Sequence, residues 1–407
     1  RKSSGNRARP AAARTEEETR MQQILTYFFL VVYSVTILGI ILVIITENRN
    51  PLKTLPWIIV LVLAPVVGLV FYFFFGQNLS KQRIISRRMR KRITLQLEEA
   101  EHAAGPEIPK AYRPLARLLR TTSHAVPLYG SRITPYTDGS SKMEALLGEI
   151  ARARHHIHLQ YYIFCDDETG RRLRDALVEK ARQGVHVRIL YDDVGCSGVS
   201  KSFFEGMRRE GIEVHAFLHV KFPRFTSKVN YRNHRKIVVI DGRVGFIGGM
   251  NIADRYVHGT EWGSWRDTHF RIEGSGVAGL QVAFLSDWSA TTKRHVSGSE
   301  YFPAAQRYTD NILQIVAGGP LGKWRALLQA DSYAVANARR RVWIQTPYYL
   351  PSDVLNTALQ TAALGGIDVR LMLPARSDSR LIDLASHSYL DDMMRAGVKI
   401  LFYEPGF

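Results

Sequence analysis

A histidine and a lysine two residues apart begin an apolar run and could perform chemistry on a phosphate. Residues 229–254 read VNYRNHRKIVVIDGRVGFIGGMNIAD, in which His234, Lys236 and Asp241 have the spacing H-x-K-x4-D. The run KIVVI predicts a buried strand, on which His234 and Lys236 share one face about 7 Å apart. An imidazole can attack phosphorus or carry a proton, and an ammonium can hold a non-bridging phosphate oxygen. The pair therefore predicts phosphodiester chemistry.

The predicted strand is followed by Asp241-Gly242, the residue pair that a two-residue hairpin turn favours. Asp241 would lie about 16 Å beyond Lys236, too far to touch the same phosphate, so we assign it a structural role in the turn. The returning strand ends in GGMN (248–251), which could bring small residues and an amide back to His234. A buried hairpin with one incidental histidine is the alternative, but the pattern extends over eighteen residues, which argues against it.

The whole pattern, H-x-K-x4-D-x6-G-[GS]-x-N, resembles the signature of the phospholipase D superfamily, and its wording is similar to that of the bacterial cardiolipin synthases within it. The resemblance implies phosphatidyl transfer through a phosphohistidine. His234 would be nucleophile or proton carrier, Lys236 would bind the phosphate, and Asn251 would assist. The superfamily also has a downstream acidic residue that fixes the histidine tautomer. Asp267, 33 residues past His234, is our candidate, and Glu261 is the alternative.

Composition indicates an anionic partner. The 407 residues carry a net charge of +18, the pI is near 9.9, and 46% of the residues are hydrophobic. A chain of this length should hold more than one domain, and its charge suits either lipid headgroups or nucleic acid. Cys165 and Cys196 provide neither a disulfide framework nor a metal set, which favours a reducing compartment. No cofactor or metal is expected, because Lys236 and the lysine of a second H-x-K set, which the resemblance implies, would supply the positive charge that a metal brings.

Two long apolar stretches predict a transmembrane hairpin. Residues 21–46 and about 54–78 are uncharged, and each exceeds the roughly 20 residues that cross a bilayer. Pro65 and Gly68 predict a kink or close helix packing in the second span. Cations concentrate outside the pair, so the positive-inside rule places both termini and the catalytic domain in the cytoplasm, with a multi-pass anchor. The resemblance to bacterial enzymes implies that this membrane is a bacterial inner membrane. This region also resembles the amino-terminal part of bacterial cardiolipin synthases.

Repeated segments predict tandem α/β domains. Residues 121–300 alternate helices and strands, which indicates a mixed, mostly parallel sheet. The order returns in 301–407, where RVWIQTPYYL echoes HIHLQYYIF, so two similar domains about a pseudo-twofold axis are expected. We predict disorder for residues 1–20. Residues 81–120 should form a basic helix along the inner membrane surface followed by a linker.

The second half-repeat reaches Phe407 without another H-x-K set. The superfamily resemblance implies one such set from each domain at a shared cleft. The second domain is therefore expected to be truncated here, with half of the catalytic residues outside this sequence. A site shared between two chains of a homodimer is the alternative.

Two polar clusters lie outside the predicted site. HHIH (155–158) has no acidic or cysteine partners in phase with it, so we predict no metal there. Asp192 and Asp193 close a predicted strand, where ligand sites of α/β proteins occur, but a helix-capping loop is the favoured interpretation.

The function that the family resemblance implies is transfer of a phosphatidyl group from one phosphatidylglycerol to another, which would release glycerol and yield cardiolipin. Two anionic substrates fit the basic composition, and two spans fit a substrate that stays in the bilayer. A hydrolase, in which water is the acceptor, is the alternative within the superfamily. A nuclease would also explain the charge, but the membrane hairpin argues against it, so no nucleic-acid partner is expected.

Overall fold

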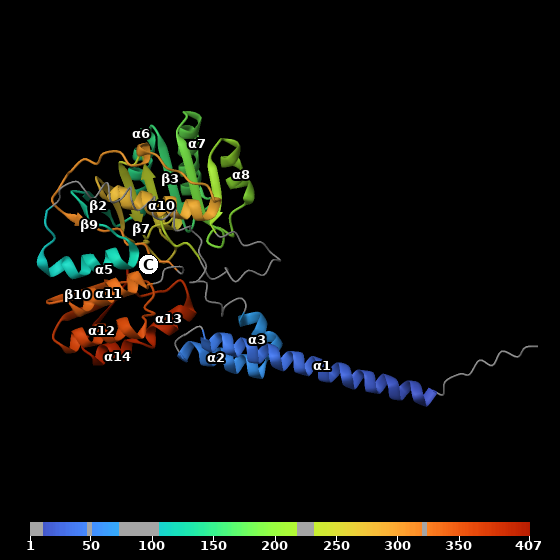
Figure 1. The fold of residues 1–407 in the computed structure, drawn as a ribbon. Coiled ribbons are helices and arrows are strands. Elements are labelled where there is room, and N and C mark those ends of the chain that lie inside the picture. The colour runs from blue at the N-terminus through green and yellow to red at the C-terminus, as the bar shows by residue number, and fades with distance from the viewer. Residues whose placement is uncertain (1–10, 47–50, 73–105, 218–231, 320–323) are drawn as a thin grey trace, which may run out of the picture. The chain divides into compact units, whose positions relative to one another are not determined.

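The computed structural model of the chain (Figure 1) describes residues 11–46, 51–72, 106–217, 232–319 and 324–407. The chain divides into two compact units. One contains the N-terminal helices, and the other contains all three sheets of the described residues and the predicted catalytic residues.

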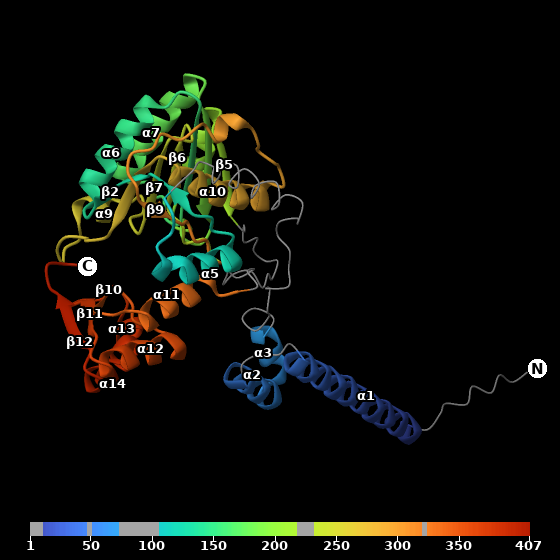
Figure 2. The ribbon, with the colours of Figure 1, turned by 60° about the vertical axis from the view of Figure 1, so that its left-hand side comes forward.

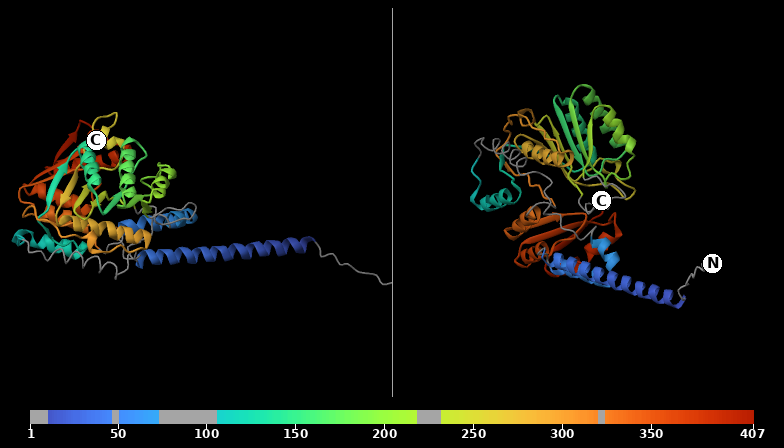
Figure 3. Two further views of the ribbon diagram at one scale, coloured as in Figure 1. Left: turned by 90° about the horizontal axis from the view of Figure 1, so that it is seen from above. Right: turned by 45° about the vertical axis from the view of Figure 1, so that its right-hand side comes forward.

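The N-terminal unit begins with a single long helix, α1 (Ala11–Thr46), seen uninterrupted in Figure 3. Its segment Thr19–Leu42 has 24 residues and a mean hydropathy of 2.4, and among the described residues it is the one helix long and apolar enough to cross a membrane. The prediction of disorder was wrong for residues 11–20, which are helical. Alanine, glutamate and arginine dominate this stretch and favour a helix that continues into the apolar run.

The second predicted span is interrupted in the structure. It comprises α2 (Pro51–Leu63) and α3 (Pro65–Phe71), separated at Ala64, and residues 73–78 lie outside the described residues. The predicted close packing is confirmed, because a Cβ on Gly68 would lie 2.9 Å from the carbonyl oxygen of Val60. Neither helix alone reaches the length of about 20 residues that spans a bilayer.

The larger sheet has seven strands in the order β2-β8-β7-β6-β3-β4-β5. Strands β3, β4 and β5 are parallel, and every other neighbouring pair is antiparallel. The prediction of a mostly parallel sheet was therefore wrong here. Only strands joined through helices run parallel, whereas β6 and β7 form a hairpin and β8 returns beside β7. The bounds are β2 (Arg132–Tyr136), β3 (His156–Tyr161), β4 (His186–Asp192), β5 (Glu213–Phe217), β6 (Ile237–Ile240), β7 (Val244–Gly248) and β8 (His269–Glu273).

Helices cover both faces of this sheet (Figure 2). Strand β6 shows why: Val238 and Ile240 belong to the core beneath α6 (Gly139–Arg152), α7 (Glu168–Arg182) and α8 (Lys201–Arg209), and Ile237 and Val239 pack with α10 (Gly276–Thr292). A strand buried on both faces has no polar alternation, as KIVVI predicted. Short elements complete this region: η3 (Lys110–Tyr112), α5 (Arg113–Ser123), β1 (Leu128–Tyr129), α9 (Asp254–His258), η4 (Ser299–Tyr301) and β9 (Ile312–Leu313).

The second α/β region contains a parallel sheet, β10-β11-β12. Gln345 is the fifth residue of β10, as Gln160 is of β3, so the sequence echo corresponds to equivalent strand positions. One face of this sheet packs with helices, whereas Trp343 is 55% exposed on the other. The bounds are α11 (Ala326–Ala336), β10 (Arg341–Gln345), α12 (Asp353–Leu364), β11 (Asp368–Pro374), α13 (Arg380–His387), α14 (Leu390–Arg395) and β12 (Lys399–Tyr403).

Two predicted boundaries differ from the structure. Strand β9 pairs with β1, so the chain still packs on the first domain beyond residue 301. Residues 81–120 were predicted to form a helix and a linker. Their first part, 81–105, lies outside the described residues, whereas α5 occupies the predicted end of the linker and begins with proline in its first turn.

Candidate active site

The H-x-K segment lies at the edge of the large sheet where β3 ends. Strand β6 is antiparallel to β3, so the residues before Ile237 lie beside those after Tyr161. His234 and Lys236 thus precede the strand rather than lie on it, which corrects the predicted position of its start. They nevertheless share a neighbour: the ring centroids of Tyr162 and His234 are 4.6 Å apart, and the Lys236 Nζ is 5.4 Å from the Tyr162 centroid.

Lys236 is buried, and its ammonium donates a hydrogen bond of 2.7 Å to the carbonyl oxygen of His234. Burial lowers the pKa of Lys236 to about 8, against the opposing effect of the Asp267 carboxylate. His234 is exposed, and among the described residues neither ring nitrogen has a hydrogen-bond partner. Partial desolvation, and then the Lys236 charge, lowers the pKa of His234, while Asp192 opposes the shift. A neutral imidazole therefore lies beside a cation near neutral pH.

Asp267 does not occupy its predicted position. Its Oδ1 accepts a 2.6 Å hydrogen bond from the Thr268 N–H, and no hydrogen bond joins it to His234 among the described residues. The reason is the pairing of β7 with β8, which sets Asp267 against Gly249, where a Cβ would overlap its carboxylate. Glu261 does not fill the role either: among the described residues no hydrogen bond joins it to His234, and its Oε1 accepts from the indole of Trp262.

The negative charge of Asp267 acts instead between two buried lysines. Besides Lys236, it opposes the lowering of the pKa of Lys142, which burial brings to about 7. The Lys142 Nζ lies 3.0 Å from the Tyr161 hydroxyl. Sequence reasoning missed Lys142, although a signal was present. Lys142 lies four residues before Leu146 and eight before Ile150, so it belongs to the buried face of α6.

Asp241 has the structural role predicted for it. Its Oδ2 accepts from the Arg154 N–H at 2.8 Å, and its Oδ1 accepts from the N–H groups of His155 and His156 at 2.8 and 2.9 Å. Asp241 also adopts a φ of 53°, the left-handed conformation of a tight hairpin. The hairpin turn is thereby tied to the start of β3, at the edge of the sheet opposite His234.

We predict that Asp241→Ala lowers the free energy of unfolding by about 2 kcal/mol, because it leaves N–H groups unpaired and places alanine at positive φ. Asp241→Asn is the matched control: asparagine keeps a carbonyl acceptor and tolerates this φ, so it should lose less. Denaturant titration of both variants measures the difference. An alanine variant as stable as the wild type but inactive would contradict the structural role and place Asp241 in the chemistry.

Asn251 is buried and both ends of its amide are engaged. Its Oδ1 accepts from the Ile163 N–H at 3.1 Å, and its Nδ2 donates to the Tyr256 hydroxyl at 2.6 Å. The structure thus brings Asn251 to the segment after β3, next to Tyr162, rather than to an open position facing His234. Its contribution to the site is to hold that segment.

Asp192 closes the turn after β4 and also reaches the H-x-K segment. Its Oδ1 accepts from the N–H groups of Val194 and Gly195, each at 3.0 Å. Its Oδ2 accepts from the Asn233 N–H at 2.9 Å. The predicted helix cap was wrong, because these N–H groups belong to a turn, and the helix that follows, α8, has Ser200 as its N-cap. The contact with the residue before His234 is an additional finding.

Two of the three histidines of HHIH belong to the core, and His155 is half-buried. His156 and His158 are fully buried, and the His158 ring stacks on Phe284 with centroids 4.5 Å apart. Burial lowers the pKa of His156 to about 3 and that of His158 well below its usual value, so both are neutral packing residues.

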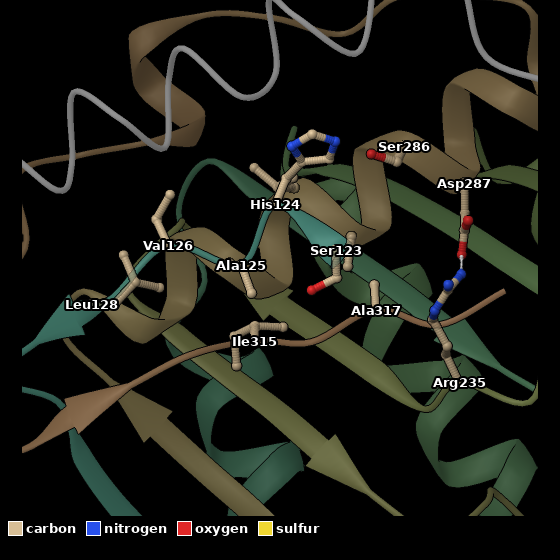
Figure 4. Close-up of a pocket in the computed structure, with 13 residues that line it drawn as sticks. Ser123, His124, Ala125, Val126, Leu128, Arg235, Ser286, Asp287, Ile315 and Ala317 are labelled. Atoms are coloured by element: carbon tan, nitrogen blue, oxygen red, sulfur yellow. Dashed lines mark hydrogen bonds and ion pairs between the residues drawn. The ribbon is translucent and has the colours of Figure 1, made fainter. Parts of the chain in front are cut away.

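A cavity of about 120 Å³ lies beside the H-x-K segment (Figure 4). Its wall is mostly apolar and comes from α10, the end of α5 and the segment after β9 that contains Ile315. The ion pair of Arg235 with Asp287 closes one end. Arg235 therefore faces this cavity and α10. The core beneath α6, α7 and α8 lies on the other side of the sheet.

Family profiles and curated relatives both match this chain to proteins of one family. A family profile described as cardiolipin synthase, PLD-like domain, matches residues 146–267 and 333–407, and one described as phospholipase D-nuclease N-terminal matches residues 34–77. A cardiolipin synthase of Geobacillus kaustophilus is 41% identical over 387 residues, which cover 93% of this chain and 77% of that protein. Cardiolipin synthase 2 of Bacillus cereus is also 41% identical, over 90% of this chain and 72% of that protein. The major cardiolipin synthase ClsA of Bacillus subtilis is 37% identical over 94% of this chain and 81% of that protein.

Proposed function

Because this chain belongs to the cardiolipin synthases of the phospholipase D superfamily, we propose that it transfers a phosphatidyl group from one phosphatidylglycerol to another with release of glycerol. The observation that carries the chemistry is the pair formed by an exposed, neutral His234 and a buried, cationic Lys236 around Tyr162. This pair supplies an accessible nucleophile and a fixed positive charge beside it.

In the first step, the free imidazole nitrogen of His234 attacks the phosphorus of phosphatidylglycerol. A P–N bond forms, the P–O bond to the headgroup glycerol breaks, and the glycerol oxygen takes up a proton. Lys236 stabilises the charge that gathers on the non-bridging oxygens. The lowered pKa of His234 favours the neutral form that this attack requires.

In the second step, a hydroxyl of another phosphatidylglycerol loses its proton and attacks the phosphorus, and the P–N bond breaks to give cardiolipin. Both steps need a group that donates and then accepts a proton. We propose a second histidine of the same motif type for this role, from a further segment of the protein or from a second copy in a homodimer. Asp267 contributes its charge to the two buried lysines rather than an orienting bond to His234.

The membrane arrangement that we propose follows from α1 and the apolar segment after it. Thr19–Leu42 crosses the bilayer, and the segment from 54 to 78 returns, so that both termini and the catalytic domain lie on the cytoplasmic side of a bacterial inner membrane. The substrate then reaches the site from the anionic bilayer, and nucleic acid is not a partner.

The test is an assay of the protein in liposomes that contain phosphatidylglycerol labelled in both the acyl chains and the headgroup glycerol. We expect labelled cardiolipin and one free glycerol per molecule formed. Phosphatidic acid with free glycerol would show instead that water is the acceptor and that the protein is a hydrolase. Cleavage of added DNA without release of glycerol would contradict the proposed substrate.

A further inference from the structure

One buried carboxylate in α10 gathers three donors from around the H-x-K segment. The Oδ2 of Asp287 accepts hydrogen bonds from the Gln160 side chain at 2.7 Å and from the Asn233 side chain at 2.8 Å. The same oxygen pairs with the guanidinium of Arg235. Asp287, Gln160 and Asn233 are all buried, so each of these polar groups depends on the others for its hydrogen bonds.

Two of the three donors are the residues immediately before and after His234. Asn233 is held from both sides, since Asp287 accepts from its side chain and Asp192 accepts from its N–H. Arg235 is likewise fixed twice, because its second guanidinium nitrogen donates to the Gly318 carbonyl at 2.8 Å. The third donor, Gln160, lies on β3 two residues before Tyr162, which packs on the His234 ring.

Residues 232–236 make no strand ladder in the structure, because β6 begins at Ile237. His234 itself has no hydrogen bond to its ring among the described residues. Besides the packing of its ring on Tyr162 and the hydrogen bond from Lys236 to its carbonyl oxygen, His234 is held in place by the anchoring of its two neighbours. A displacement of about 1 Å at a reacting group can cost about a hundredfold in rate, so this anchoring matters for attack on phosphorus.

We propose that Asp287 is a positioning residue, which fixes the backbone on both sides of His234 and so sets where its imidazole meets the phosphodiester. The proposal rests on the proposed function only as far as the first step, the release of glycerol. That step is common to transfer and to hydrolysis. Asp287 touches no substrate in this scheme and acts through Asn233 and Arg235.

The experiment compares glycerol release from phosphatidylglycerol liposomes by the wild-type protein and by Asp287→Ala, Asp287→Asn and Asn233→Ala. We expect kcat to fall about a hundredfold in Asp287→Ala, with KM changed by less than twofold. Asp287→Asn should fall between alanine and wild type, because its amide still offers one acceptor but no charge for Arg235. Ser286→Ala, the neighbouring residue in α10, is the matched control and should match the wild type.

A double-mutant cycle separates positioning from general loss of stability. If Asp287 acts through Asn233, the double variant Asp287→Ala with Asn233→Ala should be no slower than Asp287→Ala alone. Should Asp287→Ala fail to fold, Asp287→Asn and Asn233→Ala carry the same comparison. Additive losses, an unchanged kcat, or a rise in KM alone would each overturn the proposal. A wild-type protein that releases no glycerol would overturn the proposed function itself, which is a distinct result.

Discussion

Replacement of His234 by alanine is expected to reduce cardiolipin formation by roughly 10⁴-fold or more, because the side chain that forms the covalent bond to phosphorus is lost. The fold should survive this change, since the His234 side chain is exposed, packs on Tyr162 alone among the aromatic rings described, and forms no hydrogen bond with a described residue. The unfolding transition of the variant should therefore match that of the wild type, and the loss should appear in kcat.

The decisive measurement for His234 is the trapped intermediate. Wild-type protein mixed with acyl-labelled phosphatidylglycerol and quenched rapidly should retain label bound to histidine, and His234→Ala should retain none. His387→Ala is the matched control, because His387 lies in a helix, where its Nδ1 is 2.9 Å from the Asp383 carbonyl oxygen. Label that persists in His234→Ala would show that another residue is the nucleophile and that His234 serves as the proton carrier.

The predictable part of this site is the part that is local in sequence. His234, Lys236 and Asp241 could be found because a strand, a tight turn and a returning strand impose their spacing within a few residues. The structural role of Asp241 followed from distance along the strand alone. Its three hydrogen bonds to backbone N–H groups are consistent with that role. Family membership, which the motif and the N-terminal segment predicted, is confirmed by the relatives.

The residues that sequence reasoning misplaced or missed are those that arrive from distant elements. Asp267 was assigned to His234 by its separation in the chain, but the register of β8 against β7 places it beside Gly249. Asp287 comes from α10, and nothing local marks one carboxylate in a helix as the partner of Asn233. The prediction of mostly parallel strands was wrong for a similar reason, because the order of neighbouring strands in a sheet is a tertiary property.

The N-terminal region shows a different limit. Hydropathy identified both apolar stretches, and α1 extends through the first of them. Proline and glycine signalled the break and close packing at Pro65 and Gly68 but not their consequence, the division of the second stretch into α2 and α3. Hydropathy reports the preference of a segment for lipid, and backbone hydrogen bonding decides whether it forms one helix.

Lys236 should control the alkaline limit of activity. Its pKa of about 8 means that the free protein loses the ammonium as the pH rises through this value, so kcat/KM should fall above about pH 8. On the acidic side, protonation of His234 removes the nucleophile, and because its pKa is lowered, this limb should lie below the usual histidine range. A bound phosphodiester favours the charged lysine, so the alkaline limb of kcat should lie at higher pH than that of kcat/KM.

Variants assign the alkaline limb to its residue. Lys236→Met should lower kcat/KM by about 10²- to 10³-fold, the cost of removing one preorganised charge from a phosphoryl transition state, and should abolish the limb. Lys236→Arg keeps a charge that does not titrate in this range, so its residual activity should stay level through pH 8. Asp267→Asn should move the limb to lower pH, because the Asp267 carboxylate raises the pKa of Lys236.

Lys142 is the competing assignment, since its pKa of about 7 and its own interaction with Asp267 place it in the same range. Lys142→Met should leave the fall in kcat/KM near pH 8, because Lys142 is fully buried against Tyr161 and does not meet the phosphate in the proposed mechanism. Loss of the limb in Lys142→Met, with its retention in Lys236→Arg, would transfer the phosphate-binding charge to Lys142. The two lysines share one carboxylate, so only variants that remove each charge separately can decide which one the substrate meets.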